Sequence, residues 1–338
     1  MERIRHMDLA AGIMIIWVLY FHALYPMLGN AILDKVPWLF FFMPWFFYKS
    51  GLFFCPGETK GIIKKDAHKL LRAFVIWSAI GYVARIIHFL AMGQDFGFRE
   101  IVYSPLRSLF LEGSIPMNTA VWFLPVLFFV RQIANWGLKR IHPVVIMLFS
   151  GMVSITLHYL NWRFFPAWIS NTIWGLFFFS AGYYLKDKES NLILIVCSFA
   201  ITLWALFFTT IPAKYCHEVS FTEFVLWYPV CIFGCIAFDN LCKWVNKAQD
   251  SIMAKMQKKK KRHTIGLFEY VGQNALIFYV SHYILFRITF DWIARYNSKW
   301  YSGWEGLMII TFIYAIVIFP ICRFLNHRDV KNSINEGK

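Results

Sequence analysis

Long hydrophobic runs alternate with short polar stretches along the whole chain. Most runs approach the ~20 residues that an α-helix needs to cross the ~30 Å hydrocarbon core of a bilayer. Because lipid offers backbone amides no hydrogen-bond partners, helices are the expected state of such segments. The pattern predicts about ten transmembrane helices, at residues 8–28, 37–55, 73–92, 119–136, 143–160, 168–185, 191–211, 222–242, 266–288 and 305–324.

The composition favours a membrane protein without a soluble domain. Of the 338 residues, 59% are hydrophobic and 16% are charged, whereas about 25% charged residues is usual in soluble domains. No polar stretch is long enough to fold into a separate domain. We therefore expect an all-α polytopic membrane protein in which residues 1–338 form a single membrane-embedded domain.

The basic residues are distributed unevenly between the predicted loops. With ten spans, the side that holds the termini receives 23 Lys and Arg residues, and the opposite side receives 7. Cytoplasmic loops carry such an excess, so both termini are predicted to be cytoplasmic. Topology and anionic lipid then account for the formal net charge of +15, and we expect no nucleic-acid partner.

The cysteine residues show no spacing typical of a bound metal. The seven cysteines are scattered along the chain and form no CxxC pair. Cys231 and Cys235 share one face of a predicted helix inside a hydrophobic run. We interpret them as small buried residues and expect neither a disulfide framework nor a metal site.

Five ionisable side chains fall deep inside the predicted spans: His22, Lys49, Arg85, Arg131 and His282. Such residues are costly in a bilayer, and they mark functional sites by default. Counted along their helices, His22 and His282 lie at similar depth in the outer half of the membrane. Almost no carboxylate lies in the spans to neutralise the cations. The pattern predicts an internal aqueous or anion-binding cavity, which suits an enzyme and a transporter alike.

Short motifs occur in a fixed order along the chain. They are Met7–Ile13 running on to His22, Phe42–Gly51 followed by the basic Lys69–Arg72, then Val121–Pro125, and finally Val271–His282. Their order and spacing resemble those of the acyltransferase-3 family, the ten-helix membrane acyltransferases that modify bacterial surface glycans. The resemblance covers essentially the whole chain.

One position departs from the family pattern. The family usually has Arg or Lys eleven positions before the histidine of the first span, and this chain has Ala11 there. His22 is retained, so acyl transfer is still expected, but the missing cation must be supplied elsewhere or dispensed with. By depth, Arg85 is the cation nearest His22, and Lys49 lies about two turns lower.

The resemblance implies transfer of an acyl group, usually acetyl, from acyl-CoA to a hydroxyl group of a cell-surface or periplasmic glycan. It also implies a place in the bacterial cytoplasmic membrane, with membrane lipid, acyl-CoA and the glycan as partners and no metal. His22 is the expected catalytic residue, as a general base, because imidazole exchanges protons near neutral pH. The residues expected to bind the donor or acceptor, or to stabilise the oxyanion, are Asp8, Lys49, Ser50, Arg85, Trp122, Asn274 and His282.

Two other functions fit the same pattern. A cationic cavity among ten spans also suits a transporter that exports a glycan or an acylated intermediate, although the chain shows no internal repeat of the kind typical of transporters. Ala11 leaves room for a non-catalytic member of the family. Transport without chemical change, or failure to bind acyl-CoA, would distinguish these alternatives from the enzyme.

Overall fold

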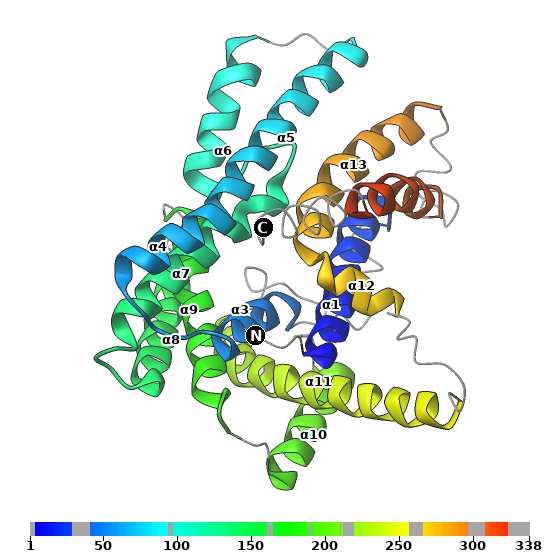
Figure 1. The fold of residues 1–338 in the computed structure, drawn as a ribbon. Coiled ribbons are helices and arrows are strands. Elements are labelled where there is room, and N and C mark those ends of the chain that lie inside the picture. The colour runs from blue at the N-terminus through cyan, green and yellow to red at the C-terminus, as the bar shows by residue number, and fades with distance from the viewer. Residues whose placement is uncertain are drawn as a thin grey trace, which may run out of the picture.

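The computed structural model describes residues 4–28, 41–93, 97–160, 165–188, 191–209, 211, 220–256, 266–296 and 308–323. These residues are largely helical and form no β-strand, which confirms the predicted all-α class (Figure 1). In chain order the helices are α1 (Arg5–Leu28), α3 (Phe42–Leu52), α4 (Thr59–Asp66), η1 (Ala67–Leu71), α5 (Arg72–Ala91), η2 (Arg99–Tyr103), α6 (Ser104–Glu112), η3 (Thr119–Trp122), α7 (Phe123–Gly137), α8 (Pro143–Tyr159), α9 (Ala167–Leu185), α10 (Leu192–Phe208), α11 (Phe221–Met256), α12 (Leu267–Gln273), α13 (Ala275–Tyr296) and Met308–Arg323.

Four of the described helical segments are long and apolar enough to cross a membrane. They are Arg5–Ala23, Thr59–Ala91, Phe221–Ile252 and Ala275–Ile293. Three shorter apolar helices accompany them: α8, α10 and Met308–Arg323. Each of the ten predicted hydrophobic segments contains a helix. The count of ten spans and the cytoplasmic placement of both termini stay predictions.

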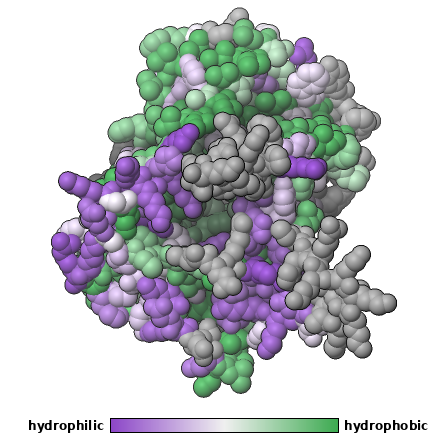
Figure 2. All heavy atoms as spheres, in the orientation of Figure 1, coloured by the Kyte–Doolittle hydropathy of each residue, from purple (hydrophilic) through white to green (hydrophobic). Residues whose placement is uncertain are grey.

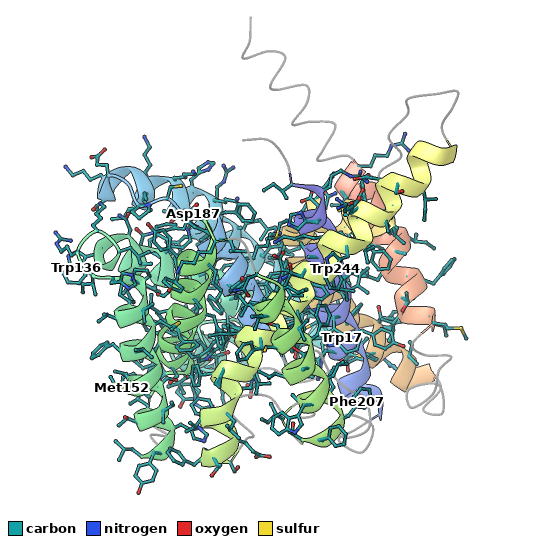
Figure 3. All side chains as sticks on the ribbon, turned by 90° about the horizontal axis from the view of Figure 1, so that it is seen from below. Trp17, Trp136, Met152, Asp187, Phe207 and Trp244 are labelled. Atoms are coloured by element: carbon teal, nitrogen blue, oxygen red, sulfur yellow. The ribbon has the colours of Figure 1, made fainter. Side chains whose placement is uncertain are left out.

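The outer surface of the helix bundle is strongly apolar. Ile193 and Phe207 on α10 are each 74% exposed, which is favourable against lipid and unfavourable against water. Helix α8 packs beside α9, and α10 packs beside α11. In Figure 3, Asp187 lies near one end of the bundle and Phe207 near the other. Figure 2 shows hydrophilic residues gathered over α4 and along α11, whereas the α5–α6 hairpin is covered by hydrophobic ones. This is the surface of a membrane protein.

Helix α6 folds back along α5. The segments α4, η1 and α5 form one continuous helix, Thr59–Ala91, and α6 descends beside its far end (Figure 1). The Tyr82 hydroxyl donates a hydrogen bond to the Ile101 carbonyl oxygen at 3.1 Å, which ties the two arms together. The predicted outer loop between spans 3 and 4, residues 93–118, is therefore largely helical.

The predicted span at residues 266–288 is wrong in one respect, because it consists of two helices. α12 ends at Gln273, and Asn274 has φ −105° and ψ 19°. The Asn274 side-chain amide donates to the Tyr270 carbonyl oxygen at 2.9 Å, which satisfies one of the acceptors at the end of α12. The long apolar helix therefore starts at residue 275 instead of 266.

Helices α1 and α12 touch backbone to backbone at two glycines. A Cβ atom on Gly12 would lie 1.8 Å from the Phe268 carbonyl oxygen, and one on Gly272 would lie 1.8 Å from the Asp8 carbonyl oxygen. Small residues permit such close approach and are the usual basis of helix packing in membranes. The relative position of α1 and α12 is therefore fixed by main-chain contact.

The glycine contact gives a direct test of this packing. We expect Gly272→Ala to destabilise the protein by about 3 kcal/mol, because the added methyl group forces the two helices apart. The matched control is Gly61→Ala on α4, where the nearest atom, Glu58 Oε2, is 3.9 Å from the new Cβ. Thermal unfolding of the purified full-length protein in detergent measures both. Equal unfolding temperatures for the two variants would contradict the close packing.

Candidate active site

Two histidines from distant parts of the chain meet inside the bundle. His22 on α1 and His282 on α13 have ring centroids 5.0 Å apart, with an angle of 70° between the ring planes. Both rings belong to helices that are apolar enough to cross a membrane. The structure thus brings together the two imidazoles that the sequence placed at similar depth.

The hydrogen bonding of His282 fixes its tautomer. Its Nδ1 lies 2.6 Å from the Tyr279 carbonyl oxygen, and a carbonyl can only accept, so Nδ1 carries the proton. His282 is completely buried. Its Nε2 atom has no hydrogen-bond partner among the described residues. A neutral His282 therefore presents an unused lone pair to the interior beside His22.

Aromatic rings surround the histidine pair. The His22 ring packs edge-on against Phe21 at 5.4 Å and against Tyr283 at 5.5 Å between centroids. His282 packs in the same way against Phe286 at 5.6 Å. These rings limit the access of water, and polar interactions are stronger in such an environment.

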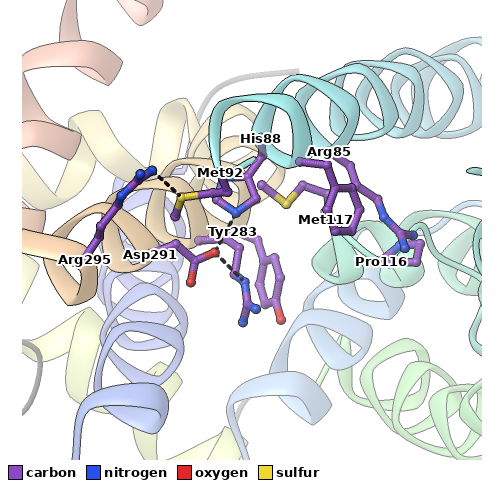
Figure 4. Close-up of a pocket in the computed structure, with 10 residues that line it drawn as sticks. Arg85, His88, Met92, Pro116, Met117, Tyr283, Asp291 and Arg295 are labelled. Carbon is purple, nitrogen blue, oxygen red and sulfur yellow. Dashed lines mark hydrogen bonds and ion pairs between the residues drawn. The ribbon is translucent and has the colours of Figure 1, made fainter. Parts of the chain in front are cut away.

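A cavity of about 720 Å³ lies next to this pair (Figure 4). Its walls come from α5, from the segment before η3 and from α13, through Arg85, His88, Phe89, Met92, Pro116, Met117, Tyr283, Arg287, Asp291 and Arg295. Tyr283 lines the cavity and also contacts His22. One aromatic ring therefore connects the cavity to the histidines. Arg85, a predicted site residue, lines this cavity together with Arg287 and Arg295.

Two other predicted site residues lie at the opposite end of α1. Lys49 Nζ donates to the Met7 carbonyl oxygen at 3.2 Å and lies 5.2 Å from the centre of the Trp45 ring. Asp8 accepts a hydrogen bond of 3.4 Å from the Gln273 side chain. Met7 precedes Ala11 by about one helical turn. Lys49 thus places a cation on α1 near the position where the family pattern has one.

Ser50 belongs to a polar cluster on another part of the bundle. Its hydroxyl accepts from Arg131 at 3.2 Å, and the Arg131 Nε atom forms an ion pair of 2.9 Å with Asp66. Gln132 donates to the same Asp66 oxygen at 3.1 Å. The expectation that the deep cations lack carboxylate partners is therefore wrong for Arg131. Asp66 escaped notice because it lies in the basic segment before the third predicted span.

The remaining predicted residues support the site from its edges. Trp122 is half-buried on η3, next to Phe123, whose ring lies 5.8 Å from that of Tyr279 on α13. The Tyr279 hydroxyl also donates to the Ala120 carbonyl oxygen. Asn274 is used in ending α12. Neither Trp122 nor Asn274 makes a ring contact or side-chain hydrogen bond with either histidine among the described residues.

Two residues near the pair were missed in the sequence. Tyr283 follows His282 directly, in a segment with many aromatic residues, so nothing local distinguishes it. Asn118 is fully buried, and its amide donates to the Val280 carbonyl oxygen at 2.9 Å. The Asn118 Oδ1 atom has no partner in the described part of the chain. In the sequence, Asn118 could have been noticed as a polar amide directly before the fourth predicted span.

The Asp66 cluster gives a prediction about the stability of the protein. We expect Asp66→Ala to lower the free energy of unfolding by about 2 kcal/mol or more, because the partly buried Arg131 loses its counter-charge. Ser50→Ala removes a single hydrogen bond and should cost about 1 kcal/mol. Thermal unfolding of both variants measures the difference. A larger loss for Ser50→Ala than for Asp66→Ala would contradict the ion pair as the centre of the cluster.

A family model described as an acyltransferase domain matches residues 4–326, nearly the whole chain. The matched region includes both histidines and the entire lining of the cavity. No curated protein and no solved structure is significantly similar to the chain.

Proposed function

The chain belongs to the acyltransferase-3 family and is a membrane acyltransferase, and on this premise we propose that it transfers an acyl group from acyl-CoA to a hydroxyl group of a cell-surface glycan, with His22 as general base. The observation that carries this proposal is the contact between His22 and His282 beside a cavity large enough for a substrate. Acetyl is the acyl group that the family resemblance favours.

The chemistry requires a base and a stabilised oxyanion. As the acceptor oxygen attacks the thioester carbonyl carbon, its proton passes to the imidazole of His22. The carbonyl oxygen of the resulting tetrahedral intermediate carries a negative charge. Collapse of the intermediate breaks the carbon–sulfur bond, and the CoA thiolate takes the proton from the imidazolium. The ester, free CoA thiol and neutral His22 are the products.

His282 is proposed as a positioning residue for His22. The hydrogen bond to the Tyr279 carbonyl oxygen sets the tautomer of His282 and leaves its Nε2 as a hydrogen-bond acceptor for His22. If one ring N–H of His22 donates a hydrogen bond to His282 Nε2, the other ring nitrogen of His22 is left to accept the proton of the glycan hydroxyl. Direct transfer follows, since the described residues near His22 hold no serine or cysteine arranged with it as a nucleophile.

Stabilisation of the oxyanion is assigned to the positive charge of the cavity that Tyr283 links to His22, which Arg85, Arg287 and Arg295 line. Lys49 is held at Met7, 15 residues and about 22 Å along α1 from His22, so it lies too far away for this role. A preformed positive charge near the developing oxyanion lowers the barrier without reorganisation. In this proposal, acyl-CoA approaches from the cytoplasm and the glycan from the outside of a bacterial cytoplasmic membrane, with both termini cytoplasmic.

Removal of the base tests the proposal. The full-length purified protein should release CoA thiol from acetyl-CoA in the presence of surface glycan extracted from the producing cells. We expect His22→Ala to reduce this rate at least ~100-fold, because general-base catalysis contributes about 10²–10⁴. His158→Ala, on α8 with its ring stacked on Phe224 at 4.1 Å, is the control and should keep nearly full activity.

Other outcomes would point to the alternative functions. Full activity of His22→Ala would rule out its role as base. Glycan that crosses proteoliposomes chemically unchanged would identify a transporter. Absence of acyl-CoA binding by correctly folded wild-type protein would identify a non-catalytic member of the family.

A further inference from the structure

The cavity carries an excess of positive charge. Three guanidinium groups, those of Arg85, Arg287 and Arg295, line it with a single carboxylate, that of Asp291. Asp291 is already engaged twice, by His88 at 3.0 Å and by Arg287 at 3.2 Å. Among the described residues, no carboxylate lies within ion-pair distance of the other two arginines. Figure 4 shows Arg295 in contact with the Met92 sulfur.

The contacts of Arg85 and Arg295 are weak for guanidinium groups. Arg85 reaches the Ser104 hydroxyl at 3.4 Å and lies over the Phe89 ring at 5.2 Å. Arg295 donates to the Ala91 carbonyl oxygen at 3.4 Å and to the Met92 sulfur at 3.6 Å. Each guanidinium has five N–H donors in a planar fork that matches carboxylate or phosphate, so most of these donors are available.

One further acidic residue lies near this end of the cavity. The negative charge of Glu100 acts on Arg85 through space. Its carboxylate, however, accepts the Gly97 backbone N–H at 3.1 Å. In the described part of the chain, Glu100 forms no hydrogen bond or ion pair with Arg85, whose hydrogen bonds go to Ser104, so three guanidinium groups share one carboxylate in this lining.

The rest of the lining is apolar and aromatic. Phe89, Met92, Met117 and Tyr283 line the cavity together with the cations. Its volume is within the ~300–1,000 Å³ typical of small-molecule sites, which usually combine apolar walls with a few fixed polar groups. An aromatic wall suits the C–H face of a sugar ring, and the arginines suit a negative group attached to it.

We infer that this cavity holds the acceptor through an oxyanion, a carboxylate or phosphate on an acidic glycan, bound by Arg85 and Arg295. The inference rests on the proposed acyl transfer, because Tyr283 places this cavity beside His22. Binding of the anion at the cavity would direct a neighbouring hydroxyl of the same sugar past Tyr283 toward the imidazole. An anionic lipid headgroup carries the same charge, but the aromatic wall next to the base favours the glycan.

Binding measurements on the full-length protein in neutral detergent test this directly. The probes are glucuronate, glucose 1-phosphate and glucose, with affinity read from the concentration dependence of the unfolding temperature. We expect both anions to bind at least ~10-fold more tightly than glucose, which corresponds to about 1.4 kcal/mol. Raising the salt concentration from about 0.05 M to about 0.5 M should weaken the binding of the two anions and leave the affinity for glucose unchanged.

The variants separate the cavity from general surface charge. Arg85→Gln and Arg295→Gln should each weaken glucuronate binding at least ~10-fold without changing the unfolding temperature of the unliganded protein, since neither arginine has an ion-pair partner among the described residues. Arg85→Lys should retain more affinity than Arg85→Gln because it keeps the charge. The matched control is Arg140→Gln, a cation on the segment after α7 whose side chain donates to the Trp136 carbonyl oxygen.

Three results would overturn the inference. The first is an unchanged affinity for glucuronate in both arginine variants, and the second is an affinity for glucose equal to that for the anionic sugars. The third is stabilisation by phosphatidylglycerol nanodiscs, but not by phosphatidylcholine nanodiscs, together with no response to either anionic sugar. The last result would assign the cavity to a lipid headgroup. Failure of the proposed function is read separately: protein that binds glucuronate through Arg85 but never releases CoA thiol would refute acyl transfer and keep the anion site.

Discussion

The main-chain contact between α1 and α12 fixes the geometry on which the candidate site depends. Gly12 and Gly272 let the two backbones approach so closely that neither position has room for a side chain. His22 lies ten residues beyond Gly12 on the unbroken α1, about 15 Å along the helix, and His282 lies ten residues beyond Gly272, past the helix break at Asn274. The ion pair of 2.9 Å between Arg5 and Glu269 adds a second contact below the glycines. From this fixed contact α1 and α13 bring the two imidazoles together, with ring centroids 5.0 Å apart.

The bilayer makes buried polar groups informative. A deep cation or carboxylate must find a partner in an apolar environment, and Asp66 with Arg131 and Asp239 with Lys243 are such pairs, at 2.9 Å and 2.7 Å. His282 Nε2 and Asn118 Oδ1 are buried without a hydrogen bond in the described part of the chain. Because orphaned groups of this kind are rare, they mark places where a ligand or ordered water is expected.

The sequence was informative where hydrophobicity and depth decide the outcome. Run lengths located the helices, and counting residues along two of them placed His22 level with His282. Features that depend on three-dimensional neighbours were not accessible. Asp66 looked like part of a solvated basic segment, because nothing local shows that it faces Arg131. The helix break at Asn274 was hidden because Asn in a long apolar run is compatible with an unbroken helix. The folding of 99–112 along α5 involves tertiary contacts, those of Tyr82 with Ile101 and of Arg85 with Ser104, that no local pattern shows.

The π-helical turn at Ala67–Leu71 affects the directions in which side chains at the two ends of the helix Thr59–Ala91 point. A π turn inserts extra chain into a helix, and each residue corresponds to about 100° of rotation about the helix axis. The π turn therefore changes the angular phase of Asp66 relative to that of Arg85, and in the observed phase Asp66 meets Arg131 while Arg85 lines the cavity. Shortening this turn by one residue would rotate the Asp66 end of the helix relative to its Arg85 end. Related chains that lack the turn should carry their acidic partner at a shifted position.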